Sequence, residues 1–263
     1  MTPSILVTGG TGTLGRLVTP LLRDTGRTVR VLSRHDHESA EGIEYVRGDL
    51  FRNEGIEPAV DGMDTVLHLA GGPKGDEVAT RHLVRAASGA GVRHLVFISV
   101  TAADRIPLGY YVSKHGAERE VAESGLPWTT LRAAQFHDLV LMVVGKMAKL
   151  PVLPVPGGVR LEPVDARDVA ARLVELTLGE PAGAVPDLAG PKVYGSDELV
   201  RTYLRASGRR RPLLTVPMPG KAGRVYRAGA NLAAEPVDRG ERTWEDFLAE
   251  RLHELPSELS PRS

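Results

Sequence analysis

The sequence predicts an α/β protein built on a Rossmann-type, doubly wound parallel sheet with a small C-terminal α/β lobe. Three observations support this fold class. Short runs rich in Val, Ile and Leu alternate with amphipathic stretches through the first half of the chain. A glycine-rich turn follows the first of these runs directly, and proline-rich sequence replaces the alternation near residue 150.

The expected strands are short and strongly apolar, which is typical of strands buried on both faces of a parallel sheet. They are residues 5–7, 28–32, 44–46, 65–69, 94–98 and 129–131. Three stretches between them, residues 16–25, 77–90 and 110–124, carry apolar residues at the spacing of helices packed on a sheet. Because parallel crossovers are right-handed, this alternation predicts a doubly wound sheet.

The proline-rich segment 150–158 is expected to end the first domain. We therefore expect an NAD(P)-binding Rossmann domain over residues 1–150, a smaller substrate-side lobe packed on it over 151–255, and a flexible tail over 256–263. Helices of the lobe are expected at residues 165–178, 196–206 and 243–252.

Composition limits the class of partner. The 33 basic side chains of Lys and Arg balance 33 Asp and Glu, so we expect a small-molecule substrate and neither nucleic acid nor membrane as partner. The chain has no cysteine, which excludes disulfides and thiolate catalysis, and its histidines lack metal-binding spacing, so no metal is expected. The N-terminal residues resemble neither a signal nor a spanning segment. We expect a cytoplasmic protein, and a homodimer stays open.

The turn after the first strand reads T-G-G-T-G-T-L-G and leads directly into a helix. Gly9 and Gly12 leave backbone N–H groups accessible to a diphosphate at the helix N-terminus, and Gly15 allows close packing of the helix on the sheet. An ordinary glycine-rich turn is the alternative. The residues expected to contact the cofactor here are Thr8, Gly9, Thr11, Gly12, Thr13 and Leu14.

The end of the second strand indicates which dinucleotide is bound. An acidic residue there would accept hydrogen bonds from a ribose 2′-hydroxyl, whereas an arginine pairs with a 2′-phosphate. The chain has Ser33 followed by Arg34, which predicts NADP(H) in preference to NAD(H). Asp36 could weaken this preference, and a solvent-exposed Arg34 is the alternative.

Two further strand ends are expected at the cofactor, because ligands of open α/β sheets bind at the carboxyl ends of the strands. Asp49 and Leu50 follow the third strand, where Asp49 either accepts from adenine or closes a turn. Ala70 and Gly71 follow the fourth strand, and their backbone is expected near the ribose.

Together these residues resemble the short-chain dehydrogenase/reductase superfamily and, within it, the atypical, NmrA-like NAD(P)H-binding branch. The resemblance covers about residues 4–250. The motifs that carry it are residues 8–15, 32–34, 47–50, 125–132 and 163–170. The branch contains quinone and isoflavone-type reductases and also cofactor-sensing regulators without catalytic activity.

Tyr110 and Lys114 form a Y-x-x-x-K pair on one face of the expected helix. The ammonium group is expected to stabilise the phenolate and lower the tyrosine pKa, so that Tyr110 gives a proton to a carbonyl oxygen. The resemblance implies that Lys114 also contacts the nicotinamide ribose. Ser99 could donate to the same oxygen. Tyr111 competes for the role of Tyr110, and packing or capping roles for Tyr110 and Ser99 stay open.

Phe136 and His137 follow the sixth strand and are expected to line the substrate pocket, although His137 could instead serve as a structural hydrogen-bonding residue. The apolar stretch 140–150 is interpreted either as a lid over an apolar substrate or as core. These residues predict an NADPH-dependent oxidoreductase acting on a quinone, enone or ketone. A non-catalytic NADP(H) sensor and a non-redox isomerase or cyclase are the alternatives.

Overall fold

The computed structural model describes residues 4–72 and 74–254. Within them a nine-stranded sheet runs in the order β13-β10-β6-β5-β4-β1-β2-β3, with β9 beside β6, and every pairing is parallel. Its strands are β1 (Ser4–Thr8), β2 (Thr28–Ser33), β3 (Ile43–Arg47), β4 (Thr65–His68), β5 (His94–Val100), β6 (Trp128–Ala133), β9 (Gly183–Ala184), β10 (Asp187–Ala189) and β13 (Val237–Arg239). The predicted Rossmann-type, doubly wound sheet is confirmed.

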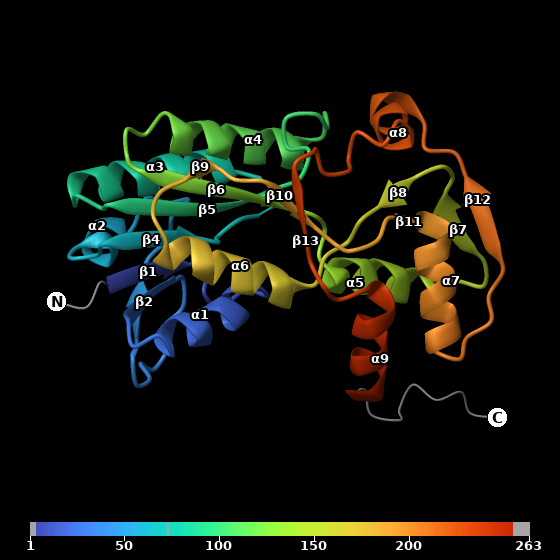
Figure 1. Cartoon of the computed structure of the whole chain (residues 1–263), viewed down its shortest axis with the longest axis horizontal. Coiled ribbons are helices and arrows are strands. Elements are labelled where there is room, and N and C mark those ends of the chain that lie inside the picture. The colour runs from blue at the N-terminus through green and yellow to red at the C-terminus, as the bar shows by residue number, and fades with distance from the viewer. Residues whose placement is uncertain (1–3, 73, 255–263) are drawn as a thin grey trace.

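Helices cover both faces of this sheet (Figure 1). α1 (Gly15–Arg23) and α6 (Ala166–Leu178) pack on one face, where Val7, Val31 and Leu173 belong to one buried core. α2 (Ile56–Val60), α3 (Asp76–Gly89) and α4 (Gly109–Ala122) cover the other face over a second core that contains Leu6 and Phe97. The near-continuous apolar strands supply side chains to both cores, as expected of a parallel sheet.

A smaller lobe lies beyond the carboxyl ends of the strands (Figure 1). Its helices are α5 (His137–Met147), α7 (Ser196–Ala206), α8 (Gly220–Arg227) and α9 (Trp244–Glu254). Its strands pair as β7 (Leu153–Pro156) with β12 (Leu213–Val216) and β8 (Arg160–Leu161) with β11 (Tyr194–Gly195). Trp244 is fully buried in the core of the lobe, and its indole N–H donates to the carbonyl of Leu199 at 3.2 Å.

The chain passes between the sheet and the lobe more than once. α6, β9, β10 and β13 follow residue 150 in the sequence, yet they pack on or belong to the main sheet. A single cut near residue 150 therefore does not separate the two parts. The tail expected at residues 256–263 lies outside the described residues.

Candidate active site

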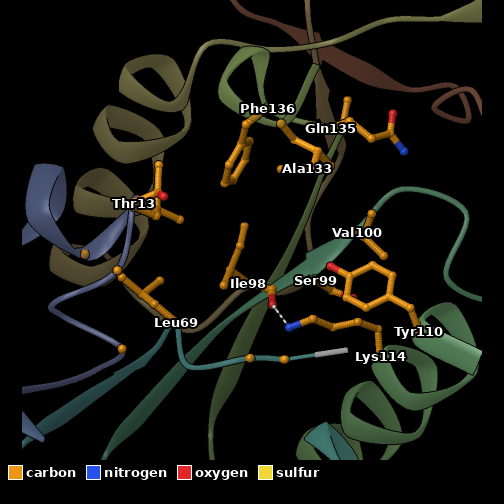
Figure 2. A pocket seen from close by; sticks show the side chains of 18 of the residues that line it. Thr13, Leu69, Ile98, Ser99, Val100, Tyr110, Lys114, Ala133, Gln135 and Phe136 are labelled. Atoms are coloured by element: carbon orange, nitrogen blue, oxygen red, sulfur yellow. Dashed lines mark hydrogen bonds between the residues drawn. The ribbon is translucent and has the colours of Figure 1, made fainter. Parts of the chain in front are cut away.

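One open cleft of about 470 Å³ lies at the carboxyl ends of β1, β4, β5 and β6 (Figure 2). It brings the glycine-rich turn together with residues from the ends of the central strands and from α4 and α5. Its lining residues are Gly9, Gly12, Thr13, Leu14, Gly15, Leu69, Gly71, Gly72, Ile98, Ser99, Val100, Tyr110, Tyr111, Lys114, Ala133, Ala134, Gln135, Phe136 and Leu139.

The glycine-rich turn fits a diphosphate because side chains are excluded from it. Gly9 has φ +71°, and a Cβ there would lie 2.6 Å from the backbone nitrogen of Ala70. A Cβ at Gly15 would meet the carbonyl oxygen of Gly9. Within the described chain, the N–H groups of Thr13 and Leu14 have no backbone acceptor. Bare donors at the start of α1 are the groups that bind a phosphate.

The residues after β2 include an arginine whose side chain is exposed. Ser33 is buried, and its hydroxyl lies within hydrogen-bond distance of the backbone of His35 at 3.2 Å and the ring of His37 at 3.0 Å. Arg34 is exposed, and no described carboxylate forms an ion pair with it. Asp36 instead pairs with Arg47 at 3.3 Å.

Three residues expected at the cofactor have structural roles instead. Thr8 is fully buried, and its hydroxyl lies 2.7 Å from Nδ1 of His68 while accepting from the N–H of Ala70 at 3.2 Å. Leu50 packs in the core between the sheet and α3. One carboxylate oxygen of Asp49 accepts from the N–H groups of Phe51 and Arg52 at 2.8 and 3.1 Å. Asp49 therefore closes a turn, the alternative to a contact with adenine.

Ala70 and Gly71, whose backbone was expected near the ribose, lie at the cleft. Gly71 lines the cleft, and Ala70 lies directly beside it. The side chain of Thr11 is not among those lining the cleft, and its carbonyl oxygen accepts from Arg16 at 2.9 Å.

Lys114 is buried at the floor of the cleft, where it forms an ion pair with Asp76 at 3.1 Å. Its ammonium group also donates to the carbonyl of Ile98 at 3.4 Å and lies 5.1 Å from the ring centre of Phe97. Asp76 opens α3, and its other carboxylate oxygen accepts from the N–H of Gly72 at 2.8 Å. Asp76 was missed by the sequence analysis, although an acidic residue that begins a helix after a glycine pair is a visible signal.

Tyr110 extends from α4 toward Ser99, and Lys114 enters from the same helix (Figure 2). Desolvation, Asp76 and Tyr111 together raise the pKa of Tyr110 to about 12. The expectation that Lys114 lowers this pKa is therefore wrong, because desolvation of the phenol and the negative charge of Asp76 outweigh the effect of the ammonium group. The phenol is a neutral hydrogen-bond donor at physiological pH.

Tyr110 and Tyr111 differ in the hydrogen-bond partners of their hydroxyl groups. Tyr111 is buried, its hydroxyl lies 3.1 Å from that of Tyr226 in α8, and it accepts from the amide of Gln135 at 3.3 Å. The hydroxyl group of Tyr111 therefore forms part of the contact between the sheet layer and the lobe. Ser99 is buried at the cleft, and its hydroxyl has no hydrogen-bond partner within the described chain. Ser99 and Tyr110 thus present hydroxyl groups to a ligand at this end of the cleft.

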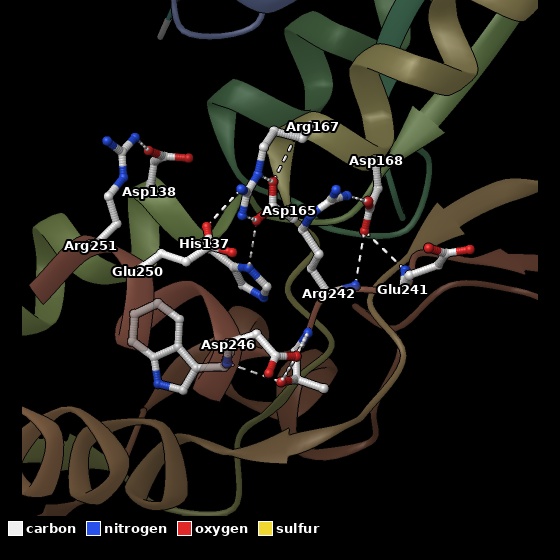
Figure 3. A network of polar contacts seen from close by, with 12 residues as sticks. His137, Asp138, Asp165, Arg167, Asp168, Glu241, Arg242, Asp246, Glu250 and Arg251 are labelled. Carbon is white, nitrogen blue, oxygen red and sulfur yellow. Dashed lines mark hydrogen bonds and ion pairs between the residues drawn. The ribbon is translucent and has the colours of Figure 1, made fainter. Parts of the chain in front are cut away.

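Phe136 lines the cleft as expected, but His137 does not. His137 is fully buried, with its ring centre 5.6 Å from Trp244 and 5.2 Å from Phe247 of α9. Figure 3 shows it facing Asp165, whose carboxylate lies 3.9 Å from Nδ1. The pocket role predicted for His137 is wrong because the first turn of α5 directs this side chain into the lobe core.

Two general properties complete the description. No group of three or more His, Asp or Glu that could hold a metal ion occurs among residues 4–72 and 74–254. In the same part of the chain, none of the helices combines the length and the apolar character needed to cross a membrane.

The parallel sheet and its glycine turn define a nicotinamide-dinucleotide-binding α/β protein, and comparison with known proteins specifies the family. Residues 9–177 match the family model described as NAD(P)H-binding. The chain is 32% identical over 212 residues to (4-alkanoyl-5-oxo-2,5-dihydrofuran-3-yl)methyl phosphate reductase of Streptomyces griseus, which covers 78% of this chain and 74% of the relative. The chain belongs to the NAD(P)H-binding family, within the atypical short-chain dehydrogenase/reductase superfamily, as an NAD(P)H-dependent oxidoreductase.

Two other known proteins are similar to this chain. The photosystem II assembly factor Ycf39 of Trieres chinensis is 28% identical over 82% of this chain and 72% of its own length. The crystal structure of an NADPH-dependent quinone oxidoreductase from Escherichia coli in complex with NADPH superposes with a TM-score of 0.80 at 20% identity. It covers 94% of this chain and 99% of that protein, which supports the fold.

Proposed function

We propose that this protein is an NADPH-dependent reductase that adds hydride to a C=O or conjugated C=C of a small, apolar quinone, enone or ketone. The observation that carries the proposal is the single cleft, which joins the bare amides of Thr13 and Leu14 to the free hydroxyl groups of Ser99 and Tyr110. A cofactor seated on the turn and a substrate near these hydroxyl groups share one cavity. The cleft has an apolar wall that includes Ile98 and Phe136, which suits a flat conjugated substrate.

Each of three cleft residues has a separate role in the proposed reduction. NADPH, when bound, supplies the hydride. Tyr110, with its raised pKa, keeps its proton and gives it to the substrate oxygen as negative charge develops there. Ser99 donates a hydrogen bond to the same oxygen. Lys114, held by Asp76, positions the nicotinamide ribose as a fixed donor.

The preference for NADPH rests on the exposed arginine after β2. Arg34 lies where the 2′-phosphate is expected, and guanidinium groups bind phosphate in a bidentate manner. Asp36 is paired with Arg47, so its charge is compensated and does not repel the phosphate.

The relatives support the choice of substrate class. The Streptomyces griseus relative is named a reductase of an alkanoyl furanone phosphate, and the Escherichia coli structure is of a quinone oxidoreductase. Both names describe conjugated carbonyl compounds. The possibility of a homodimer stays open, and the cytoplasmic location stays a prediction.

The Tyr110→Phe variant tests the proposed role of the phenol. Removal of the hydroxyl group takes away the proton donor but leaves the glycine turn intact, so turnover should fall about 100-fold. The measurement is NADPH oxidation, followed by absorbance, with a panel of quinones, enones and ketones. NADPH affinity of the variant, measured by fluorescence titration, should stay within about twofold of the wild-type value, because the proposed partner of the phenol is the substrate oxygen and not the cofactor.

Two outcomes would contradict the proposal. Full turnover in Tyr110→Phe would remove this tyrosine from the mechanism. Tight NADPH binding without oxidation by any acceptor would favour the non-catalytic sensor. The Val112→Ser variant, on the same helix and 60% exposed, is the control for general effects of substitution on α4.

A further inference from the structure

Helix α5 presents an apolar face to solvent. Leu139, Met142 and Val143 are 46%, 47% and 44% exposed, and their spacing places them side by side on one face of the helix. We call these three residues the α5 stripe. The opposite face, with Val140 and Val144, is buried in the lobe core. The core therefore accounts for one face of α5 and leaves the α5 stripe without a partner in the described chain.

The α5 stripe is continuous with the cleft. Leu139 lines the cleft together with Phe136, while Met142 and Val143 lie one turn further along the helix, outside the cleft lining. Phe136 directly precedes α5, and its side chain points into the cleft (Figure 2). An apolar surface thus begins inside the cavity and extends along the helix beyond its mouth.

We propose that the natural substrate carries an extended aliphatic or isoprenoid chain that leaves the cleft at Leu139 and lies on the α5 stripe. The conjugated carbonyl head would sit beside Ser99 and Tyr110, so this inference rests on the proposed function. An apolar chain suits the stripe because burial of its methylenes and of the exposed side chains removes both from water. The α5 stripe is then a specificity determinant for chain length.

Other occupants fit the stripe less well. A stable protein interface buries roughly 800 Å² and about 20 residues on each partner, whereas the α5 stripe has only three residues. Lys146 is exposed further along the same helix and limits the apolar surface in that direction. The continuity with Leu139 favours a ligand that already occupies the cleft.

The test uses one head group with chains of increasing length. We expect kcat/KM of the wild-type protein for 2-alkyl-1,4-naphthoquinones to rise about twofold per half-buried methylene from methyl to hexyl, and then to level off. Substrates are kept below their aggregation concentration. In the Met142→Ser/Val143→Ser variant, the ratio of hexyl to methyl kcat/KM should fall at least fivefold, because two of the three apolar side chains are lost.

The matched control is Leu21→Ser on α1, where the leucine is 43% exposed and far from the cleft lining. This control should keep the full chain-length dependence. Equal kcat/KM for methyl and hexyl substrates in the wild-type protein would overturn the inference while leaving the proposed reductase activity intact. Failure of the proposed function would appear differently, as no oxidation of NADPH at any chain length.

Two further measurements exclude the other occupants. Sedimentation of the wild-type protein with vesicles of phosphatidylcholine and phosphatidylglycerol, lost in the double serine variant, would assign the stripe to a lipid surface and overturn the inference. Analytical ultracentrifugation that shows a dimer in the wild-type protein and a monomer in the variant would overturn it in favour of a second copy. A monomer without vesicle binding, together with the chain-length effect, supports the inference.

Discussion

Asp76 determines how the cleft uses Lys114. A neighbouring ammonium group alone would lower the pKa of a phenol, but desolvation and the carboxylate of Asp76, 3.1 Å from the ammonium of Lys114, oppose this effect at Tyr110. Tyr110 has a pKa of about 12 as a result of desolvation, Asp76 and Tyr111. The site is therefore built around a protonated donor, and Lys114 acts as a positioned hydrogen-bond donor.

His68 is a second buried group beside the cleft, and burial controls its protonation. Its Nδ1 lies 2.7 Å from the hydroxyl of Thr8, which accepts from the N–H of Ala70 at 3.2 Å. Its Nε2 lies 3.0 Å from the hydroxyl of Thr80. Burial and the nearby charge of Lys114 lower the pKa of His68 to about 3. The neutral ring therefore links β1 and β4 to α3.

This pKa predicts loss of stability in acid. An unfolded histidine titrates near 6.5 and the folded one near 3, so the stabilisation from His68 is present above pH 6.5 and is lost as pH falls toward 3. Between pH 7 and pH 5 the wild-type protein should lose about 2 kcal/mol of unfolding free energy more than His68→Gln. Urea unfolding followed by circular dichroism measures both losses, and equal losses would refute the assignment.

At the residue scale, the sequence showed the groups whose roles depend on local spacing. The glycine turn, Tyr110 and Lys114 lie in motifs a few residues long, and all three reach the cleft. The role of Asp76 was not predicted because its partner, Lys114, lies on another helix. His137 was misplaced because the sequence does not show the rotation of α5, which directs this ring toward α9.

Among the elements, the turn between β1 and α1 leaves no space for a side chain at Gly9. Gly9→Ala introduces a Cβ 2.6 Å from the backbone of Ala70 at φ +71°, whereas Gly62→Ala meets nothing within 4 Å at φ +69°. Both variants should lose about 1–2 kcal/mol of unfolding free energy, because an alanine is strained in the left-handed backbone conformation. Only Gly9→Ala should also lose NADPH affinity, by tenfold or more, because relief of the clash moves the phosphate-binding amides.

Thermal unfolding and NADPH titration of these two variants measure the two effects separately. Equal NADPH affinity in Gly9→Ala and Gly62→Ala would mean that the turn does not hold the cofactor. A loss of affinity confined to Gly9→Ala assigns the effect to the clash rather than to the backbone angle.

Elements with clear periodicity were predicted well. β1, β2, β4 and β5 and helix α3 lie within a few residues of their expected positions. Most of the elements that were missed are short: α2 has five residues, and β9, β10 and β13 have two or three. The strands of the lobe, with two to four residues, and the eight-residue helix α8 were missed as well. Such segments carry no measurable periodicity, and pairing with β6 and its neighbours across the chain stabilises them.

The whole molecule joins sheet and lobe through interleaved chain segments rather than through one linker. Arg167 of α6 pairs with Asp165 at 2.8 Å and with Glu250 of α9 at 2.6 Å (Figure 3). Tyr226 of α8 contacts Tyr111 beside the cleft. The lobe is thus fixed to the sheet layer through α6 and through α4. Proline-rich sequence near residue 150 could not reveal this arrangement, because local composition carries no information on which later segments return.

Calorimetric titration of the wild-type protein with NADPH and with NADH tests the central claim most directly. We predict one NADPH bound per chain, NADH bound roughly tenfold more weakly, and similar affinities for the two coenzymes in Arg34→Ala, because a hydrogen-bonded charge pair with the 2′-phosphate is lost. A well-folded sample that takes up neither coenzyme would contradict the cofactor site on which the proposed reductase mechanism depends.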